Sequence, residues 1–181
     1  MGKQPVLEAL QQRRSHSKHT DDAPSHAELE RLVAAMSSVA DHSRLRPWRV
    51  IELRGGARAK LGKGLAKASG GDRAKYVSKA MRSPLILVIV VSPRKSKVPV
   101  WEQEAVASGV AHLLGLLLHE AGWGTMWKTG SHTRSKALRK ALGVQKPEYL
   151  MGWLYVGGIP DRDRKSKPRK PLDLNRHLTV L

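Results

Sequence analysis

The chain contains no cysteine among its 181 residues. A disulfide framework, a thiol nucleophile and a cysteine-ligated zinc site are therefore excluded. Phenylalanine is also absent and there are only three tyrosines, so the aromatic platforms on which single-stranded nucleic acids stack are scarce. A chain without cysteine is compatible with a reducing cytoplasm, which is where we expect the protein to act.

Long hydrophobic runs are equally rare. Met1–Leu10 lacks the basic region and apolar core of a secretory signal, and no segment approaches the ~20 apolar residues that a membrane span requires. The closest segment, Ala105–Leu118, is too short and carries His112, so we predict a buried core helix there. A chain of this size can bury most of its apolar surface in one core, and we expect a single domain over residues 1–181.

Acidic residues are few, because fifteen Asp and Glu stand against thirty-three Lys and Arg, which leaves a formal net charge of +18. Such a charge favours nucleic acid, anionic lipid or a phosphorylated ligand, and charge alone does not choose among them. Residues 58–67 and 162–170 are dense in basic side chains, but no helix-turn-helix, zinc-finger or RNA-binding motif accompanies them. A solvated basic surface is the simplest interpretation, and nucleic-acid binding has no motif to support it.

Hydrophobic periodicity predicts helices and strands without internal repeats, which indicates an α+β fold. Ser25 and Glu28 have the spacing of a capping box ahead of a helix at about residues 26–39. The unbroken apolar run Pro84–Val91 is typical of a central strand that is buried on both faces. The other predicted elements are a strand at 48–53, basic helices at 57–68 and 72–82, a long helix at 101–121, a helix near 134–142 and a last strand at 149–156.

Generic catalytic and metal motifs fail at their required spacing. The glycine-rich segment 56–64 lacks the phosphate-loop spacing and the Ser or Thr that would bind magnesium. His119 and Glu120 are not followed by the second histidine of a zinc protease, and Ser108 lacks the flanking glycines of a nucleophile elbow. No carboxylate or cysteine stands at ligand spacing from His16, His19 or His26. We therefore predict no metal site and assign no catalytic acid or base.

Three stretches far apart in the chain together resemble the nitroreductase family of FMN-dependent oxidoreductases, especially its short, single-domain branch. They are QRRSHSKHT at 12–20, DHSRLRPW at 41–48 and GWGTMWKTG at 122–130. Val98–Glu104 is also similar to the start of a long helix in the short branch. The resemblance covers roughly residues 10–160. It implies a central, mostly antiparallel sheet flanked by helices, with a long buried central helix.

The first stretch is similar to the family's phosphate-binding segment. The resemblance implies that Arg13, Arg14 and Ser15 hold the FMN phosphate and the ribityl or flavin edge, with Lys18 where the short branch has an arginine. Guanidinium groups and a hydroxyl suit a phosphate dianion, because they form charge-assisted and partly bidentate hydrogen bonds. The alternative interpretation is a solvated helix C-terminus, where cations are favoured without any ligand.

The other two stretches correspond to the family's flavin contacts. The resemblance implies that Trp127, Lys128 and Thr129 lie beside the isoalloxazine, where backbone N–H groups can bond N5 and O4. His42 matches a histidine that contacts FMN in the short branch, and Arg46 stands in the same wall of the flavin site. Taken singly, Trp127 is equally consistent with a core aromatic, and His42 with a loop histidine bonded to backbone.

The sequence departs from the family at two positions of this site. Ser17 stands where longer members have an arginine, and Arg46 replaces the glutamine before Pro-Trp. If the chain before Pro47 is extended, Arg44 and Arg46 share one side and one of them faces the flavin. Longer members also have a basic pair near the C-terminus that reaches the phosphate, and the corresponding residues here are Lys167 and Arg169.

The resemblance implies an NAD(P)H oxidoreductase that uses FMN in two half-reactions. NAD(P)H passes a hydride to the flavin and leaves, and the reduced cofactor then reduces a nitroaromatic, quinone or similar acceptor. The resemblance also implies a homodimer with FMN at the subunit interface, in agreement with the apolar surface of residues 105–118. Two alternatives stay open: a basic nucleic-acid-binding protein on the same fold without redox activity, and a family member with a different flavin reaction.

Overall fold

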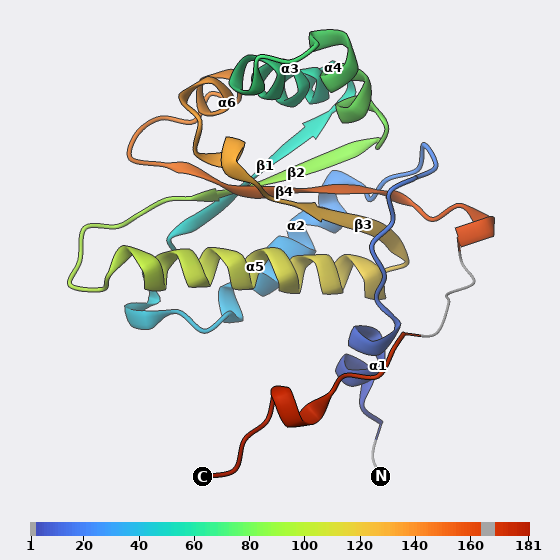
Figure 1. The fold of residues 1–181 in the computed structure, drawn as a ribbon, viewed down its shortest axis with the longest axis vertical. Helices are drawn as coiled ribbons and strands as arrows, with labels where there is room; N and C mark the ends of the chain where they lie inside the picture. Colours follow the sequence, from blue (N-terminus) through green and yellow to red (C-terminus); the bar gives the residue numbers. More distant parts are fainter. Residues whose placement is uncertain (1–2, 164–168) are drawn as a thin grey trace.

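The computed structural model describes residues 3–163 and 169–181 of the chain. A four-stranded sheet lies between two layers of helices, with helices α3, α4 and α6 on one face and α2 and α5 on the other (Figure 1). The helices and strands are α1 (Pro5–Gln12), α2 (His26–Ala35), β1 (Trp48–Arg54), α3 (Arg58–Ser69), α4 (Arg73–Met81), β2 (Leu85–Val91), α5 (Val100–Glu120), β3 (Trp123–Lys128), α6 (Lys136–Ala141) and β4 (Tyr149–Gly158).

The sheet has the strand order β1-β2-β4-β3, and every neighbouring pair is antiparallel. All seven residues of β2 are buried, which confirms the prediction of a central strand covered on both faces. The register pairs Val50 with Ile89, Leu87 with Leu154 and Met126 with Tyr155. Because β1 and β3 are the edge strands of this sheet, their outer backbone groups are open to other partners.

Two apolar clusters form the core, one on each face of the sheet. The cluster under α3 and α6 contains Leu61 and Leu138, and the cluster under α5 contains Leu114 and Leu118. These four leucine side chains are fully buried. Because side chains of a strand alternate between its faces, β2 and β4 contribute to both clusters.

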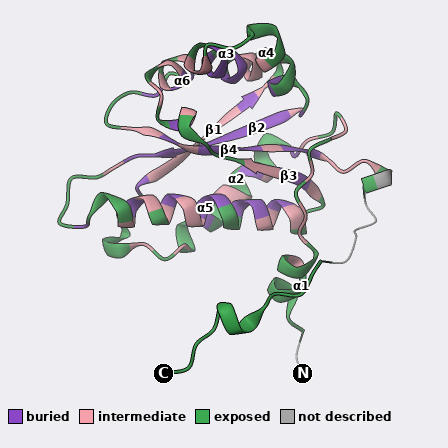
Figure 2. Cartoon of the chain, in the orientation of Figure 1, coloured by how far each residue is buried: buried purple, intermediate pink, exposed green. Residues whose placement is uncertain are grey.

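Helix α5 confirms the predicted long helix and ends at the expected glycine, since Gly122 follows it with a φ of 87°. Its side toward the sheet is buried, as Figure 2 shows. Its other side is not covered, because Trp101 is 67% exposed and Leu113 is 42% exposed. These two apolar side chains of α5 are therefore in contact with water in the single chain.

The remaining predicted elements agree with the structure to within a few residues. The Ser25 hydroxyl accepts a hydrogen bond from the Glu28 backbone N–H at 3.1 Å, as the capping-box spacing predicted. The predicted helix at 26–39 is an α-helix to Ala35 that continues as a 3-10 turn over Met36–Ser38. Helix α1 and strand β3 were not among the predicted elements.

The N-terminal segment crosses the outer edge of β3. Ser15 forms a parallel bridge with Thr125, the His16 N–H donates to the Thr125 carbonyl at 2.9 Å, and the Thr20 N–H donates to the Gly158 carbonyl at 2.9 Å. Helix α1 and the C-terminal segment lie together outside the sheet, and both are largely exposed (Figures 1 and 2). In the part of the chain that the structure describes, no helix is long and apolar enough to span a membrane.

Candidate active site

Three arginines gather where α1 meets the edge of β3. Arg13 directs one guanidinium nitrogen toward the Ser15 hydroxyl at 3.5 Å. Arg14 donates to the backbone carbonyls of Gln11, Gln12 and Arg13 at 2.8–3.1 Å, so it caps the C-terminus of α1. The alternative interpretation of a cation at a helix end therefore applies to Arg14, while Arg13 is turned toward Ser15.

The C-terminal segment adds a further cation to this cluster. Arg169 donates a hydrogen bond to the Arg13 carbonyl, although the two residues are far apart in the sequence. The sequence predicted that a basic pair at 167 and 169 would lie near the phosphate site. Arg169 lies beside Arg13, and Lys167 falls outside the described residues.

Burial and neighbouring positive charges lower the pKa of two basic side chains in this region. Burial, followed by the charges of Arg169 and Arg14, lowers the pKa of Arg13. Burial, followed by the charges of His16, Arg13 and Arg14, also lowers the pKa of His119. Cations held this close together repel one another, and an anion placed among them would relieve that repulsion.

A cavity of about 240 Å³ opens beside the arginine cluster, between α5 and β3. Its walls include Arg13, Ser15 and the indole of Trp127. The Trp127 and His112 rings lie 6.3 Å apart between centroids, which places the indole against α5. The cavity is smaller than the ~300–1,000 Å³ of typical small-molecule pockets, so a cofactor of FMN size needs additional walls.

A second cavity, of about 410 Å³, lies on the other face of the sheet, between β3, β4 and α4. Lys128 and Ser17 line its side nearest the β3 edge, and Lys79 and Arg82 line it from α4 and the turn after it. Trp127 and Lys128 are consecutive residues of one strand, so their side chains point to opposite faces. The C-terminal end of β3 thus separates two cavities, and each of them is lined by both cationic and apolar side chains.

The backbone of β3 is open between these cavities. The Thr125 carbonyl points away from β4, because it accepts the hydrogen bond from His16. Backbone groups of a strand alternate in direction, so the N–H and C=O of Trp127 point to the same outer side. A planar ligand at this edge can receive a hydrogen bond from a fixed backbone donor.

The structure does not bring His42 or Arg46 to this site within one chain. His42 Nδ1 lies 2.8 Å from a Glu102 carboxylate oxygen near the start of α5. His112, which lines the smaller cavity, is ten residues further along the same helix, a separation of about 15 Å. His42 therefore contacts a carboxylate near the start of α5, away from the smaller cavity. Neither interpretation of this histidine predicted this contact.

The loop before Pro47 contradicts the expectation of an extended chain. Ser43, Arg44 and Arg46 all have positive φ, at 62°, 52° and 47°. Left-handed backbone costs of order 1 kcal/mol at each non-glycine residue, and here the Arg46 N–H is fixed by an Asp41 carboxylate at 2.6 Å. Arg44 and Arg46 thus do not share a side as residues of an extended strand would.

The predicted site residues divide into two sets. Arg13, Ser15 and Trp127 line the smaller cavity and Lys128 lines the larger one, whereas Lys18 and Thr129 are exposed and line neither. The residues that the sequence did not indicate at this site are His16, His119, Lys79 and Arg82. Their positions depend on tertiary packing, and no local spacing marks them.

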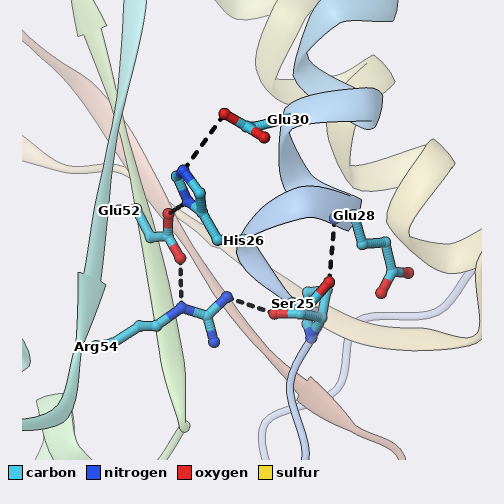
Figure 3. Close-up of polar contacts among 7 residues, drawn as sticks. Ser25, His26, Glu28, Glu30, Glu52 and Arg54 are labelled. Carbon is cyan, nitrogen blue, oxygen red and sulfur yellow. Dashed lines mark hydrogen bonds and ion pairs between the residues drawn. The ribbon is translucent and has the colours of Figure 1, made fainter.

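A separate group of titratable residues joins α2 to β1 (Figure 3). His26 Nδ1 lies 2.6 Å from a Glu52 carboxylate oxygen and its Nε2 lies 3.5 Å from Glu30, while Arg54 bonds to Glu52 and to the Pro24 carbonyl. The hydrogen bond and charge of Glu52 raise the pKa of His26. Because β2 and β4 separate β1 from β3, this group fastens the opposite edge of the sheet and takes no part in the site.

His19 connects the β3 edge to the core and predicts a pH dependence of stability. Its Nδ1 lies 2.8 Å from the Ser83 hydroxyl, and burial, followed by the charge of His16, lowers its pKa to about 4. The neutral ring is the form that the fold stabilises, so its contribution is complete above the unfolded pKa of ~6.5 and is lost as the pH falls toward 4.

We expect His19→Asn, which keeps a polar atom near Ser83, to lose less stability than the wild type between pH 7 and pH 4.5. The loss of unfolding free energy between the two pH values should be smaller in the variant by about 1–2 kcal/mol after allowance for solvent screening. Urea unfolding at both pH values measures it, with the exposed His177→Asn as the control. Equal pH dependence in the His19→Asn variant and the wild type would show that His19 takes no part.

Comparison with known proteins shows which family this chain is similar to. The model of the nitroreductase family matches residues 10–158. The chain belongs to the nitroreductase family. As a nitroreductase family member it is an oxidoreductase, and the expected family resemblance is confirmed.

Curated relatives of this nitroreductase family member cover nearly its whole length. It is 32% identical over 159 residues to "Putative NAD(P)H nitroreductase YdjA" of Escherichia coli K12, covering 84% of this chain and 87% of that protein. It is 29% identical over 172 residues to "Putative NAD(P)H nitroreductase" of Haemophilus influenzae, covering 90% and 93%.

Solved structures confirm the predicted nitroreductase-like α+β fold. A nitroreductase-like family protein from Bacillus cereus has a TM-score of 0.83 at 20% identity, covering 100% of this chain and 98% of that chain. The FMN and NADPH-dependent nitroreductase NfnB from sphigopyxis sp. strain HMH has a TM-score of 0.73 at 16% identity, covering 97% and 98%. At these identities the likeness concerns the fold.

Proposed function

We propose that this nitroreductase family member is an FMN-dependent NAD(P)H oxidoreductase that reduces nitroaromatic, quinone or similar acceptors in two half-reactions. The observation that carries the proposal is the cavity beside β3 that Arg13, Ser15 and Trp127 line together, with Lys128 lining the cavity on the other face of the same strand. Cationic and hydroxyl donors suit a phosphate, and an outward backbone donor beside an indole suits a flat heterocycle. The FMN and NADPH dependence of NfnB supports this cofactor, and the names of the curated relatives support NAD(P)H as the reductant.

The residues at this edge fit FMN by their chemistry. Arg13 and Ser15 would hold the phosphate, with Arg169 adding positive charge beside them. The outward N–H of Trp127 would donate to the flavin edge, and the side chains of Trp127 and Lys128 would flank the ring. When bound, FMN supplies the redox chemistry, accepting a hydride from NAD(P)H and passing reducing equivalents to the acceptor.

The chain itself binds and orients the cofactor rather than acting as an acid or base. Its donors at the β3 edge are fixed by the sheet, so little reorganisation is needed to hold a bound heterocycle. Lys128, Lys79 and Arg82 line the larger cavity, and cations there would stabilise negative charge on a neighbouring reduced cofactor. No side chain is assigned a catalytic proton transfer.

Titration of the purified, flavin-free protein with FMN tests this proposal. We expect saturable quenching of flavin fluorescence with one FMN bound per chain. Riboflavin, which lacks the phosphate, is the matched ligand and should bind at least tenfold more weakly, because it forms none of the charge-assisted hydrogen bonds. Absence of saturable binding would remove the proposed function.

We further propose that the active form is a homodimer in which the partner subunit completes the flavin site. Several apolar side chains are exposed on three segments of the single chain: Val6, Leu7 and Leu10 of α1, Trp101 and Leu113 of α5, and Leu172, Leu174 and Leu178 near the C-terminus. Exposure of this extent is typical of an oligomer interface. A second copy packed on α5 would bring His42 and Arg46 of the partner subunit toward the β3 edge.

Sedimentation should therefore give twice the chain mass of 20.0 kDa. Leu113→Glu, which places a charge in the apolar face of α5, should shift the protein to a monomer and reduce FMN binding at least tenfold, since an unpaired interface charge costs several kcal/mol. Lys95→Glu, at an exposed position of the loop before α5, is the control and should remain dimeric. A monomer that still held stoichiometric FMN would contradict the shared site.

A further inference from the structure

The solvent side of the α3, α4 and α6 layer is covered with cations. Lys60, Lys63 and Lys67 occupy positions i, i+3 and i+7 of α3, so they project from one side of that helix. The buried side of the same helix carries Leu61 and Leu65. Exposed basic residues also cover α4 and α6, among them Arg73, Lys75, Lys136 and Lys140.

The charge of this layer is not compensated. Residues 57–82 contain eight Lys and Arg and one acidic residue, Asp72, whose side chain already accepts a hydrogen bond from the Lys75 N–H at 3.0 Å. In the part of the chain that the structure describes, no ion pair involves a lysine or arginine of α3 or α4. Four arginines elsewhere form ion pairs among the described residues, for example Arg49 with Glu148 at 2.7 Å.

The layer also contains a concave site of about 530 Å³ between α3 and the start of α4. Its cations are Lys63, Lys67 and Arg73, and its other lining residues are Ala66 and two glycines. None of these side chains supplies an apolar wall larger than a methyl group. Such a surface suits a hydrated, compact anion and does not suit an apolar ligand.

We propose that the α3–α4 face binds the phosphate backbone of duplex nucleic acid without reading its sequence. Uncompensated lysines and arginines along one face are the usual basis of such binding, because each phosphate that they neutralise releases counterions. A membrane fits less well, since the only large apolar side chain exposed on these helices is Met81, at 37%. Single strands fit less well because no exposed aromatic platform accompanies the lysines on these helices.

The solvent side of α3 and the arginine cluster proposed to hold the FMN phosphate lie on different parts of the molecule. The α3–α4 layer covers one face of the sheet, and α5 with the arginine cluster lies on the other (Figure 1). The apolar face of α5, which we assign to the dimer, is likewise opposite the cationic layer. A nucleic acid on the solvent side of α3 and on the concave site at the start of α4 therefore leaves the smaller cavity and the proposed dimer interface free, while Lys79 and Arg82 line the larger cavity on the inner side of the same layer.

Fluorescence anisotropy with a labelled duplex of unrelated sequence tests this inference across a series of salt concentrations. We expect a Kd of about 10⁻⁴–10⁻⁶ M near physiological salt and a steep fall of log K with log salt. In the variant Lys60→Gln, Lys63→Gln, Lys67→Gln, the slope should become shallower by about 0.9 for each phosphate that is no longer neutralised, and binding at low salt should weaken at least tenfold. Glutamine has a helix propensity close to that of lysine, so α3 should persist.

The matched control removes three charges from the loop between β2 and α5, as Arg94→Gln, Lys95→Gln, Lys97→Gln. This control variant should change the slope of log K against log salt by less than about 0.9, which is the value for one phosphate. Absence of binding by the wild type at low salt would overturn the inference, and so would equal reductions of affinity in the two triple variants, because net charge alone would then explain the binding. Flavin content is measured separately and does not affect either outcome, so failure of the proposed function remains distinguishable.

Discussion

Arg13→Ala is expected to weaken FMN binding by about 10- to 100-fold, because loss of a charge-assisted hydrogen-bond partner costs about 1.5–3 kcal/mol. Arg13 is the member of the cluster whose guanidinium lies beside Ser15 and lines the smaller cavity. Arg14 is occupied with the C-terminal carbonyls of α1, so Arg14→Ala should lose less affinity and should destabilise α1 instead. Fluorescence titration with FMN measures both variants.

Two further variants make this test specific. Arg13→Lys keeps the charge but loses the planar fork, so it should recover only part of the affinity. Arg31→Ala removes an exposed cation of α2 and should bind FMN as the wild type does. If Arg13→Ala and Arg31→Ala bind FMN equally well, the phosphate is held elsewhere and the arginine cluster belongs only to the end of α1.

Gly152→Ala is expected to destabilise the fold by about 1–3 kcal/mol and to displace the flavin contact with it. A Cβ at Gly152 would lie 2.4 Å from the Lys128 carbonyl oxygen and 2.8 Å from the Trp127 ring. Neither neighbour can move without a cost in free energy, because one is backbone and the other is a ring packed against α5. The end of β3 must shift, and FMN affinity should fall together with the free energy of unfolding.

Gly109→Ala provides the matched control for this substitution. A Cβ at Gly109 would meet only Val39, at an ordinary contact distance of 3.6 Å. Because Gly109 lies within α5, alanine there should leave stability unchanged or raise it by up to about 1 kcal/mol. Urea unfolding and FMN titration of both variants measure the free energy of unfolding and the FMN affinity. A Gly152→Ala protein with wild-type stability and affinity would show that the two strands do not need this close approach.

The sequence predicted elements whose signals are local. The capping box at Ser25, the apolar run Pro84–Val91 and the glycine after α5 each act over a few residues, and each was found where it was predicted. The length and apolar content of the helix at 101–121 were similarly decisive. Burial was harder to infer, because composition does not tell whether an apolar helix side faces the core or another subunit.

The site was less accessible to such reasoning. Strand β3 is a short run with glycine, threonine and tryptophan directly after α5. Its extended conformation depends mainly on its pairing with β4, which the local sequence does not reveal. The ion pair between His42 and Glu102, and the contact of Arg169 with Arg13, join residues distant in sequence. An extended chain before Pro47, the condition under which Arg44 and Arg46 would share one side, is not met, because the Asp41 carboxylate accepts a hydrogen bond from the Arg46 N–H in a left-handed turn.

This chain is expected to hold a flavin that NAD(P)H can reduce. Anaerobic absorption spectra of the purified FMN-loaded protein, recorded before and after addition of NADPH or NADH, test it most directly. We expect a yellow protein whose visible flavin absorption is lost on addition of the nucleotide and returns when a nitroaromatic or quinone is added. A protein that stays colourless in the presence of FMN, or a bound flavin that neither nucleotide bleaches, would contradict it.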